Sequence, residues 1–303
     1  MRSTCSSLIY ATVLLLYFIK GVYMLVKRTM SKNVVSVSVP GNREKVLDLM
    51  RKENKAVLPV VKEDTDILVG LVTRSDLINN PDEEQIAMLM SRNLVTVSPN
   101  DDVVDAARQM IKNNVRRVPV VNDDGELVGI ITSFDLVSKA LTKVEIEDAV
   151  ENYMITTVPT TWEKSPLNVA FESMNQFGLK SILALDDDAK LSGILTETDF
   201  ISEIEIISER SEHSSTVGTE GDKWSWDSTS VLYIEKNHLK FTDKVVEDVA
   251  VDNVEVANSK TNVTDCAKKM KNLNIEQIPV IGVEGELVGL VRASDLIKAL
   301  VKE

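Results

Sequence analysis

The sequence predicts a mixed α/β (α+β) fold that is built from four copies of a βαββα repeat. Four segments end in nearly the same string: a glycine, two apolar residues, a threonine that is arginine in the last copy, two variable residues, an aspartate and an apolar residue. These segments are Gly70–Leu77, Gly129–Leu136, Gly193–Phe200 and Gly289–Leu296. The strings recur at near-regular spacing, with a longer interval before the last, and such self-similarity is typical of repeat proteins. Methionines lie at matching distances upstream, at Met50, Met110, Met174 and Met270.

The second repeat shows the order of elements. The stretch 94–97 predicts a strand, and we expect a helix to begin at Ser98-Pro99, because proline is favoured at helix starts. Two short apolar strands follow at 118–121 and 127–132, and a second helix begins around Asp135. The first helix carries an apolar stripe at helical spacing, formed by Val103, Ala106, Ala107, Met110 and Ile111. A unit of this size cannot cover its own sheet, so we expect the repeats to pair into two modules.

Composition and charge narrow the classes of function. The 303-residue chain has a formal net charge of -13, which argues against nucleic acid as a general partner. Cys5 and Cys266 are far apart, and only His213 and His238 could add nitrogen ligands, which is too few for a zinc site or a disulfide framework. The repeats contain no histidine and the chain has no Gly-x-x-x-x-Gly-Lys phosphate loop. We therefore do not expect an enzyme.

Residues 1–25 form a hydrophobic N-terminal segment with three interpretations. Leu8–Ile19 is apolar apart from one threonine, and Lys20 then interrupts the run. A spanning helix needs about 20 mostly apolar residues, so residues 8–26 would form a membrane anchor if Lys20 reaches the interface. A signal peptide is the second interpretation, although there is no clear cleavage site. The third is that the start is mis-assigned and that translation begins at Met24, directly before the first repeat.

The order of elements and the closing Gly-x-x-Thr-x-x-Asp string resemble the CBS domain. The resemblance places the four repeats at 26–81, 82–143, 146–206 and 244–303, with an insertion at 207–243. It implies that repeats one and two form one side-by-side module, and repeats three and four another. In this family such modules bind AMP, ADP, ATP or S-adenosylmethionine in clefts between paired repeats. The four-repeat architecture is similar to that of the gamma subunit of AMP-activated protein kinase.

The closing string supplies groups that suit an adenosine ligand. The Asp135 carboxylate could accept hydrogen bonds from both ribose hydroxyls, while Thr132 could donate to a phosphate oxygen. Amides at the start of the second helix would add a favourable field for an anion. We expect adenine to read backbone groups near Thr96 and Val118. The alternative is that each Thr–Asp pair is simply a helix cap.

Differences among the repeats rank the sites. Repeat two ranks first, because Arg116 and Arg117 stand directly before its second strand, and in related proteins basic residues there reach ligand phosphates. The alternative for these arginines is a solvated pair at the sheet edge. Repeat one keeps Thr73 and Asp76, and we expect it to share the same cleft.

The second pair of repeats is less complete. Repeat three keeps Thr196 and Asp199 and offers Lys180 for a phosphate. Repeat four has Arg292 in place of threonine, so we expect that site to be degenerate or filled by Arg292 itself, with Asp295 only a cap.

The insertion has no counterpart in the other repeats. Residues 209–222 are rich in Ser, Glu and Gly and predict a mobile loop, while 231–234 predict a strand. Trp224 and Trp226 would share one face of a strand. They would either pack over the second module or form a partner-binding ridge.

The sequence therefore predicts a regulatory sensor. An adenine nucleotide or S-adenosylmethionine would act as regulatory ligand, and its occupancy would be transmitted to a separate, unidentified effector protein. The alternative is a non-catalytic scaffold or ribonucleoprotein-binding protein with empty clefts. A homodimer through the modules is consistent with the family, and the lack of a disulfide framework favours the cytoplasm.

Overall fold

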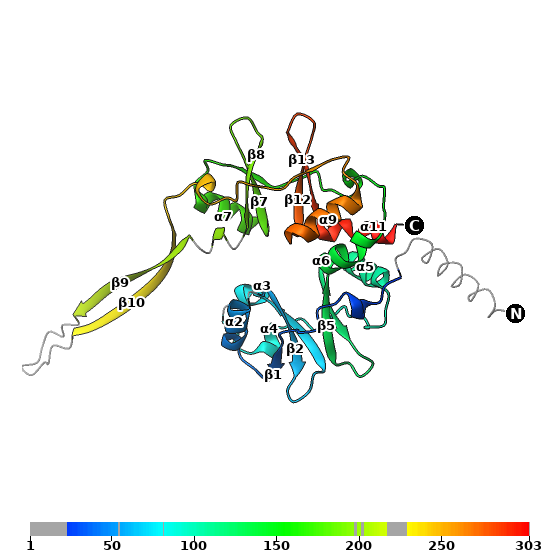
Figure 1. Cartoon of the computed structure of the whole chain (residues 1–303). Helices are drawn as coiled ribbons and strands as arrows, with labels where there is room; N and C mark the ends of the chain where they lie inside the picture. The colour runs from blue at the N-terminus through cyan, green and yellow to red at the C-terminus, as the bar shows by residue number, and fades with distance from the viewer. Residues whose placement is uncertain are drawn as a thin grey trace, which may run out of the picture. The chain divides into compact units, whose positions relative to one another are not determined.

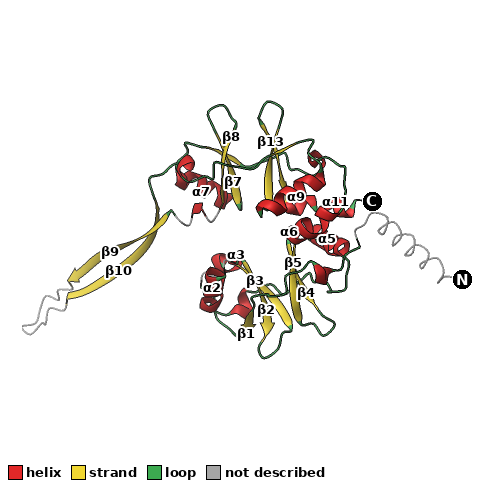
Figure 2. Cartoon of the chain, viewed as in Figure 1, coloured by secondary structure: helices red, strands yellow, loops and turns green. Residues whose placement is uncertain are grey.

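The computed structural model describes residues 23–53, 55–80, 82–196, 199–200, 203–216 and 229–302. Helices and small sheets alternate along the chain, which confirms the α+β class (Figure 1). Figure 2 shows the same alternation by secondary structure. The chain divides into two compact units. The first comprises Met1–Thr156, Val256–Ile281 and Val288–Glu303, and the second Thr157–Glu255 and Gly282–Leu287.

Repeat one contains a three-stranded sheet in the first unit. Its elements are β1 (Val37–Val39), α2 (Arg43–Lys52), β2 (Val57–Lys62), β3 (Leu68–Thr73) and α3 (Arg74–Asn79). β1 runs parallel to β2, and β3 runs antiparallel to β2. Helix α2 begins after Asn42, whose side chain accepts from the Lys45 amide, and it buries Val46 and Met50 against the strands.

Repeat two follows with the predicted order but different helix bounds. Its elements are α5 (Val103–Lys112), β4 (Arg117–Val121), β5 (Leu127–Thr132), α6 (Ser133–Asp135), the π-helical turn η2 (Leu136–Ala140) and the 3₁₀ turn η3 (Leu141–Lys143). The expected helix start at Ser98-Pro99 was wrong. Asp102 caps α5 instead, because its carboxylate accepts from the Val104 amide at 2.8 Å. The expected strand at 94–97 is reduced to one bridge between Val97 and Val120.

Repeat four contributes its helices to the same unit as repeat two. Its elements are β11 (Ala257–Asn258), α9 (Val263–Leu273), β12 (Gln277–Ile281), β13 (Leu287–Arg292), α10 (Ala293–Leu296) and α11 (Lys298–Val301). Helix α9 contacts η2 and η3, and α11 contacts α5. The helices of repeats two and four therefore share one hydrophobic core, to which Met110 and Met270 both contribute.

The second unit holds repeat three and the insertion. Its elements are β6 (Thr160–Trp162), α7 (Leu167–Gln176), β7 (Ser181–Leu185), β8 (Leu191–Thr196), the ribbon β9 (Ile204–Thr216) and β10 (Thr229–Phe241), and η5 (Val246–Asp248). The expected loop at 209–222 was wrong as far as residue 216. Residues 204–216 pair antiparallel with 229–241, so main-chain hydrogen bonds to a distant segment override the local composition. Trp224 and Trp226 lie outside the described residues.

Repeats one and two exchange short segments. Residues 24–31, which we call the first crossover segment, contain η1 (Val26–Arg28) and pack on repeat two. Ser31 and Ile130 exchange backbone hydrogen bonds of 2.9 and 3.0 Å. In return, α4 (Ile86–Leu89) packs on repeat one, where the Ser91 amide donates to the Leu71 carbonyl at 2.8 Å. Each sheet is thus overlaid by the segment that precedes its neighbour.

The same crossing recurs in the other repeats and explains the glycine of the repeated string. In the segment around η4 (Val150–Asn152), Ile155 forms a β-bridge with Leu290. In the segment around η5, Val251 forms a β-bridge with Ile194. A Cβ on Gly129 would lie only 2.5 Å from Met30 Sδ of the first crossover segment. The other glycines of the string face Met90, Met154 and Ala250 at similar distances.

Candidate functional site

Thr132 and Asp135 form a complete helix cap where β5 ends. The Asp135 Oδ2 atom accepts from the Thr132 amide at 2.9 Å and from the Thr132 hydroxyl at 2.6 Å. The Asp135 amide donates back to Thr132 Oγ1 at 3.0 Å. This reciprocal arrangement is a capping box, which satisfies amides that the first helical turn leaves without partners. The capping interpretation of the string is therefore realised, and one carboxylate oxygen is committed to it.

The other oxygen of Asp135 binds a lysine. Lys139 Nζ lies 2.6 Å from Asp135 Oδ1 and 2.6 Å from the backbone carbonyl oxygen of Thr29. The Asp135 side chain is only 11% exposed, so this ion pair is partly shielded from solvent. Lys139 stands on the π-helical turn η2, a geometry often found at functional sites.

Repeats one and three build the same Thr–Asp pair. In repeat one, Asp76 Oδ2 accepts from the amide and the hydroxyl of Thr73, both at 2.7 Å. No described residue donates to the other oxygen of Asp76. In repeat three, Asp199 Oδ2 accepts from the amide and the hydroxyl of Thr196 at 2.7 and 2.8 Å.

Repeat four replaces the cap by ion pairs. Arg292 donates through Nε to Asp295 Oδ2 at 2.6 Å, and Lys298 Nζ lies 3.0 Å from Asp295 Oδ1. The Arg292 side chain makes no cap hydrogen bond to the helix. Two cations therefore occupy a nearly buried carboxylate, which leaves it little capacity to accept from a ligand.

The arginine pair of repeat two lies beside the Thr–Asp pair. Arg117 is paired directly opposite Thr132 across the β4–β5 ladder. The Ser133 amide donates to the Arg116 carbonyl at 2.9 Å, which joins this backbone to the start of α6. Arg116 is exposed and Arg117 half-buried. Among the described residues, neither guanidinium forms a hydrogen bond or an ion pair, so their donors are available.

The remaining residues that were predicted to bind the ligand differ in how far their side chains are exposed to solvent. Thr96 is exposed, one residue before the bridge that joins Val97 to β4. The Val118 side chain lies in the shared core, so only its backbone could meet a ligand. Lys180 is exposed and stands directly before β7, at the position that Arg116 holds before β4.

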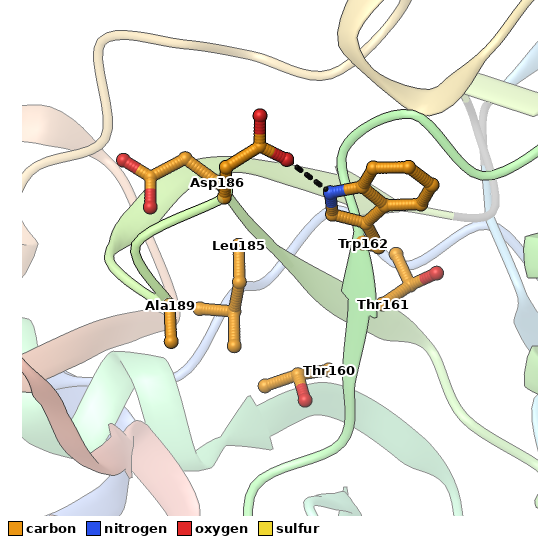
Figure 3. A pocket seen from close by; sticks show the side chains of 7 residues that line it. Thr160, Thr161, Trp162, Leu185, Asp186 and Ala189 are labelled. Atoms are coloured by element: carbon orange, nitrogen blue, oxygen red, sulfur yellow. Dashed lines mark hydrogen bonds between the residues drawn. The ribbon is translucent and has the colours of Figure 1, made fainter.

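A pocket of about 350 Å³ lies in repeat three (Figure 3). Its lining comprises Thr160, Thr161, Trp162, Leu185, Asp186, Asp187 and Ala189. Trp162 Nε1 donates to Asp187 Oδ1 at 2.9 Å, and Lys164 Nζ donates to Asp187 Oδ2 at 2.5 Å. That ion pair lowers the pKa of Asp187 and raises the pKa of Lys164. The pocket lies at the turn between β7 and β8, at the opposite end of the sheet from Thr196, so it is separate from the predicted ligand groups.

Sequence reasoning missed two features here. Trp162 was not singled out, although a tryptophan directly after two threonines on a short edge strand is a visible signal. Lys139 was also missed, and its spacing of four residues after Asp135 was the available sign of an ion pair.

Among the described residues, the other groups that could bind a metal or act as a nucleophile do not assemble into a site. Cys266 is a free, buried thiol, and burial raises its pKa to about 12. Within the described ranges, no cluster of His, Cys, Asp and Glu side chains could hold a metal ion. No helix in the described part of the chain is long and apolar enough to cross a membrane. Residues 1–22, which carry most of the hydrophobic N-terminal segment, lie outside the described residues.

Comparison with known proteins places these features in a family. The chain is 23% identical over 292 residues to the uncharacterized protein MJ1225 of Methanocaldococcus jannaschii, covering 90% of this chain and 97% of that one. The crystal structure of MJ1225, described as a candidate archaeal homolog of g-AMPK, has a TM-score of 0.66 at 20% identity and covers 91% of this chain and 100% of that chain. An uncharacterized conserved protein from Pyrococcus horikoshii has a TM-score of 0.65 at 28% identity, covering 92% of this chain and 100% of that chain.

Part of the chain is also similar to part of an enzyme. The L-aspartate semialdehyde sulfurtransferase of Methanosarcina acetivorans is 35% identical over 116 residues, which are 38% of this chain and 23% of that protein.

The family model for the CBS domain matches residues 26–83, 85–141, 150–206 and 246–302. These matches span most of the sequence, so the chain belongs to the CBS-domain proteins and carries four CBS domains.

Proposed function

We propose that this protein is a regulatory sensor that binds an adenosine derivative at repeats one and two. The observation that carries the proposal is the Arg116–Arg117 pair, whose guanidinium groups have no partner among the described residues and which lies beside Thr132 and Asp135. In a chain of net charge -13, two adjacent arginines that pair with no described carboxylate concentrate positive charge locally. Cationic donors next to a carboxylate match the phosphate and the ribose of a nucleotide, while the Thr132 hydroxyl already donates to Asp135.

The arginines favour a phosphate-bearing ligand. Two guanidinium groups can donate in pairs to phosphate oxygens. The sulfonium of S-adenosylmethionine is positive and would be repelled by the same groups. AMP, ADP and ATP are therefore the leading candidates, with S-adenosylmethionine as the comparison ligand. Thr96 and the Val118 backbone would lie on the adenine side, and Thr196, Asp199 and Lys180 would form a weaker site in repeat three.

The state of each carboxylate supports a ranking of the repeats. Asp76 keeps one oxygen without a described donor, Asp135 shares one oxygen with a single lysine, and Asp295 holds two cations. We expect Asp135 and Asp76 to serve the first module and Asp295 to contribute nothing to ligand binding.

Calorimetric titration with AMP, ADP, ATP and S-adenosylmethionine tests this ranking. Asp135→Ala should weaken nucleotide binding at repeats one and two by at least about tenfold, because the ribose hydroxyls lose a charged acceptor. Asp295→Ala is the matched control, since Asp295 is also buried and holds the same position of the repeated string, and it should change the affinity little. Thermal melting of both variants separates loss of the cap from loss of binding. Equal losses of affinity in the two variants would contradict the ranking.

The second candidate function is a scaffold without a small-molecule ligand. It is favoured by the finding that the Thr–Asp pairs are internally satisfied as caps. Absence of binding by all four ligands, in folded protein freed of carried-over nucleotide, would support it. We further propose that the protein acts on a separate effector protein. We also propose that it forms a homodimer through its CBS repeats and that it is located in the cytoplasm.

A further inference from the structure

Lys139 joins the carboxylate of repeat two to the segment that leads into repeat one. Its ammonium contacts Asp135 Oδ1 and the Thr29 carbonyl oxygen, both at 2.6 Å. Thr29 is 0% exposed and lies in the first crossover segment. No other described group donates to that carbonyl. Lys139 therefore satisfies a buried acceptor that solvent does not reach.

A ligand at Asp135 would have to compete with Lys139. Asp135 Oδ2 already accepts two hydrogen bonds from Thr132, so both ribose hydroxyls would have to donate to Oδ1, which has two acceptor positions and gives one of them to Lys139. That oxygen holds the ammonium in a short, charge-assisted contact. Drawing Lys139 away from Asp135 would also draw it away from Thr29. One ammonium thus contacts both the carboxylate and the crossover segment.

We propose that Lys139 couples occupancy of Asp135 to the first crossover segment, a step that rests on the proposed function. When a ligand engages Asp135 Oδ1, Lys139 is displaced and the Thr29 carbonyl loses its donor. The crossover segment then holds repeat two less tightly. Because residues 24–31 continue directly toward β1 of repeat one, ligand binding at one repeat is reported to its neighbour.

The other repeats offer matched comparisons. In repeat one the residue four positions after the aspartate is Asn80, which donates to the Asp76 backbone carbonyl and leaves the carboxylate alone. In repeat four, Lys298 approaches Asp295 from three positions later, and its described contacts include no carbonyl of a crossover segment. The bridge from carboxylate to crossover segment is thus specific to repeat two among the described contacts.

Hydrogen exchange of the ligand-free full chain tests the link between Lys139 and the segment. In Lys139→Met, the Val26 and Ser31 amides, which donate to Asp101 and Ile130, should exchange roughly tenfold faster, as expected when a buried carbonyl loses its donor. Lys139→Arg should restore most of the protection. Lys298→Met is the matched control and should leave both amides unchanged. Unchanged exchange in Lys139→Met, or an equal change in Lys298→Met, would overturn the link.

Titration with AMP tests the competition. Lys139→Met should bind AMP several-fold more tightly than wild type, because the competitor for Asp135 Oδ1 is gone, and AMP should accelerate exchange at Ser31 only when Lys139 is present. Weaker or unchanged binding in Lys139→Met would overturn the displacement step. If wild type binds none of the four candidate ligands, the proposed function fails and the coupling to a ligand fails with it. The ligand-free exchange then still decides separately whether Lys139 holds the crossover segment.

Discussion

Replacing Gly129 with alanine tests whether the crossover requires a glycine in the repeated string. An added Cβ would lie 2.5 Å from Met30 Sδ and 3.0 Å from the Ser31 carbonyl oxygen. The thioether can rotate away, but the Ser31 carbonyl is held because the Ile130 amide donates to it at 3.0 Å. Overpacking of this kind costs about 1–3 kcal/mol in the free energy of unfolding. Alanine gains less than about 1 kcal/mol from the reduced freedom of the unfolded chain, so the steric cost should win.

Urea unfolding at constant temperature, combined with a double-mutant cycle, measures this cost. Met30→Ala alone should destabilise the protein by removing a partly buried side chain that packs on the core. In the Gly129→Ala/Met30→Ala double variant, the new methyl group should fill part of the space left by the thioether. The summed effects should therefore exceed the measured one. Wild-type stability for Gly129→Ala, or strict additivity in the double variant, would refute the steric argument.

Two further predictions concern titration and burial. The Lys302 ammonium and the Tyr153 hydroxyl lower the pKa of Asp148, so its contribution to stability is present above about pH 4 and is lost as the pH falls through the lowered pKa. Asp148→Asn should therefore flatten the acid side of a plot of melting temperature against pH, and an unchanged slope would contradict this. Burial raises the pKa of Cys266 to about 12, so in a Cys5→Ser background a thiol reagent should label Cys266 only after unfolding. Rapid labelling of the native protein would show that the thiol is reachable.

Local signals in the sequence were sufficient for most elements of the repeats. The strand expected at 127–132 is observed as β5 with the same bounds, and the apolar stripe predicted for the helix of repeat two lies mostly in the core through α5. The helix start was placed early because proline at position 99 was read as its first turn. Asp102 is a stronger signal, since its carboxylate can accept from the amides that open the helix.

Pairing between segments that are far apart in the sequence could not be predicted from local signals. The crossing of residues 24–31 onto repeat two depends on backbone contacts with residues 72 to 99 positions away, which no local period in the sequence can indicate. The sequence does contain one sign of the crossing segments: Met30, Met90 and Met154 each stand four residues after the apolar residue that begins the turn or short helix of the segment. In the insertion, the strand expected at 231–234 lies within β10, whereas β9 was missed for the same reason. Its ladder depends on pairing of 204–216 with 229–241 and not on the composition of either strand.

In the candidate site, the repeated string does not predict which cation binds each aspartate. The string makes Asp76 and Asp135 equivalent, since both form the same capping box with the preceding threonine. The structure separates them by their counter-ions: Asp135 binds Lys139, and Asp76 has no described cation. Lys139 can hold its position because the Thr29 carbonyl, brought by the crossover segment, gives the ammonium a second acceptor. Repeat one also receives a crossing segment, but it has Asn80 at the position of Lys139, so the two carboxylates differ through the residue four positions after the aspartate. That position lies outside the repeated string, and an alignment of the strings alone does not contain it.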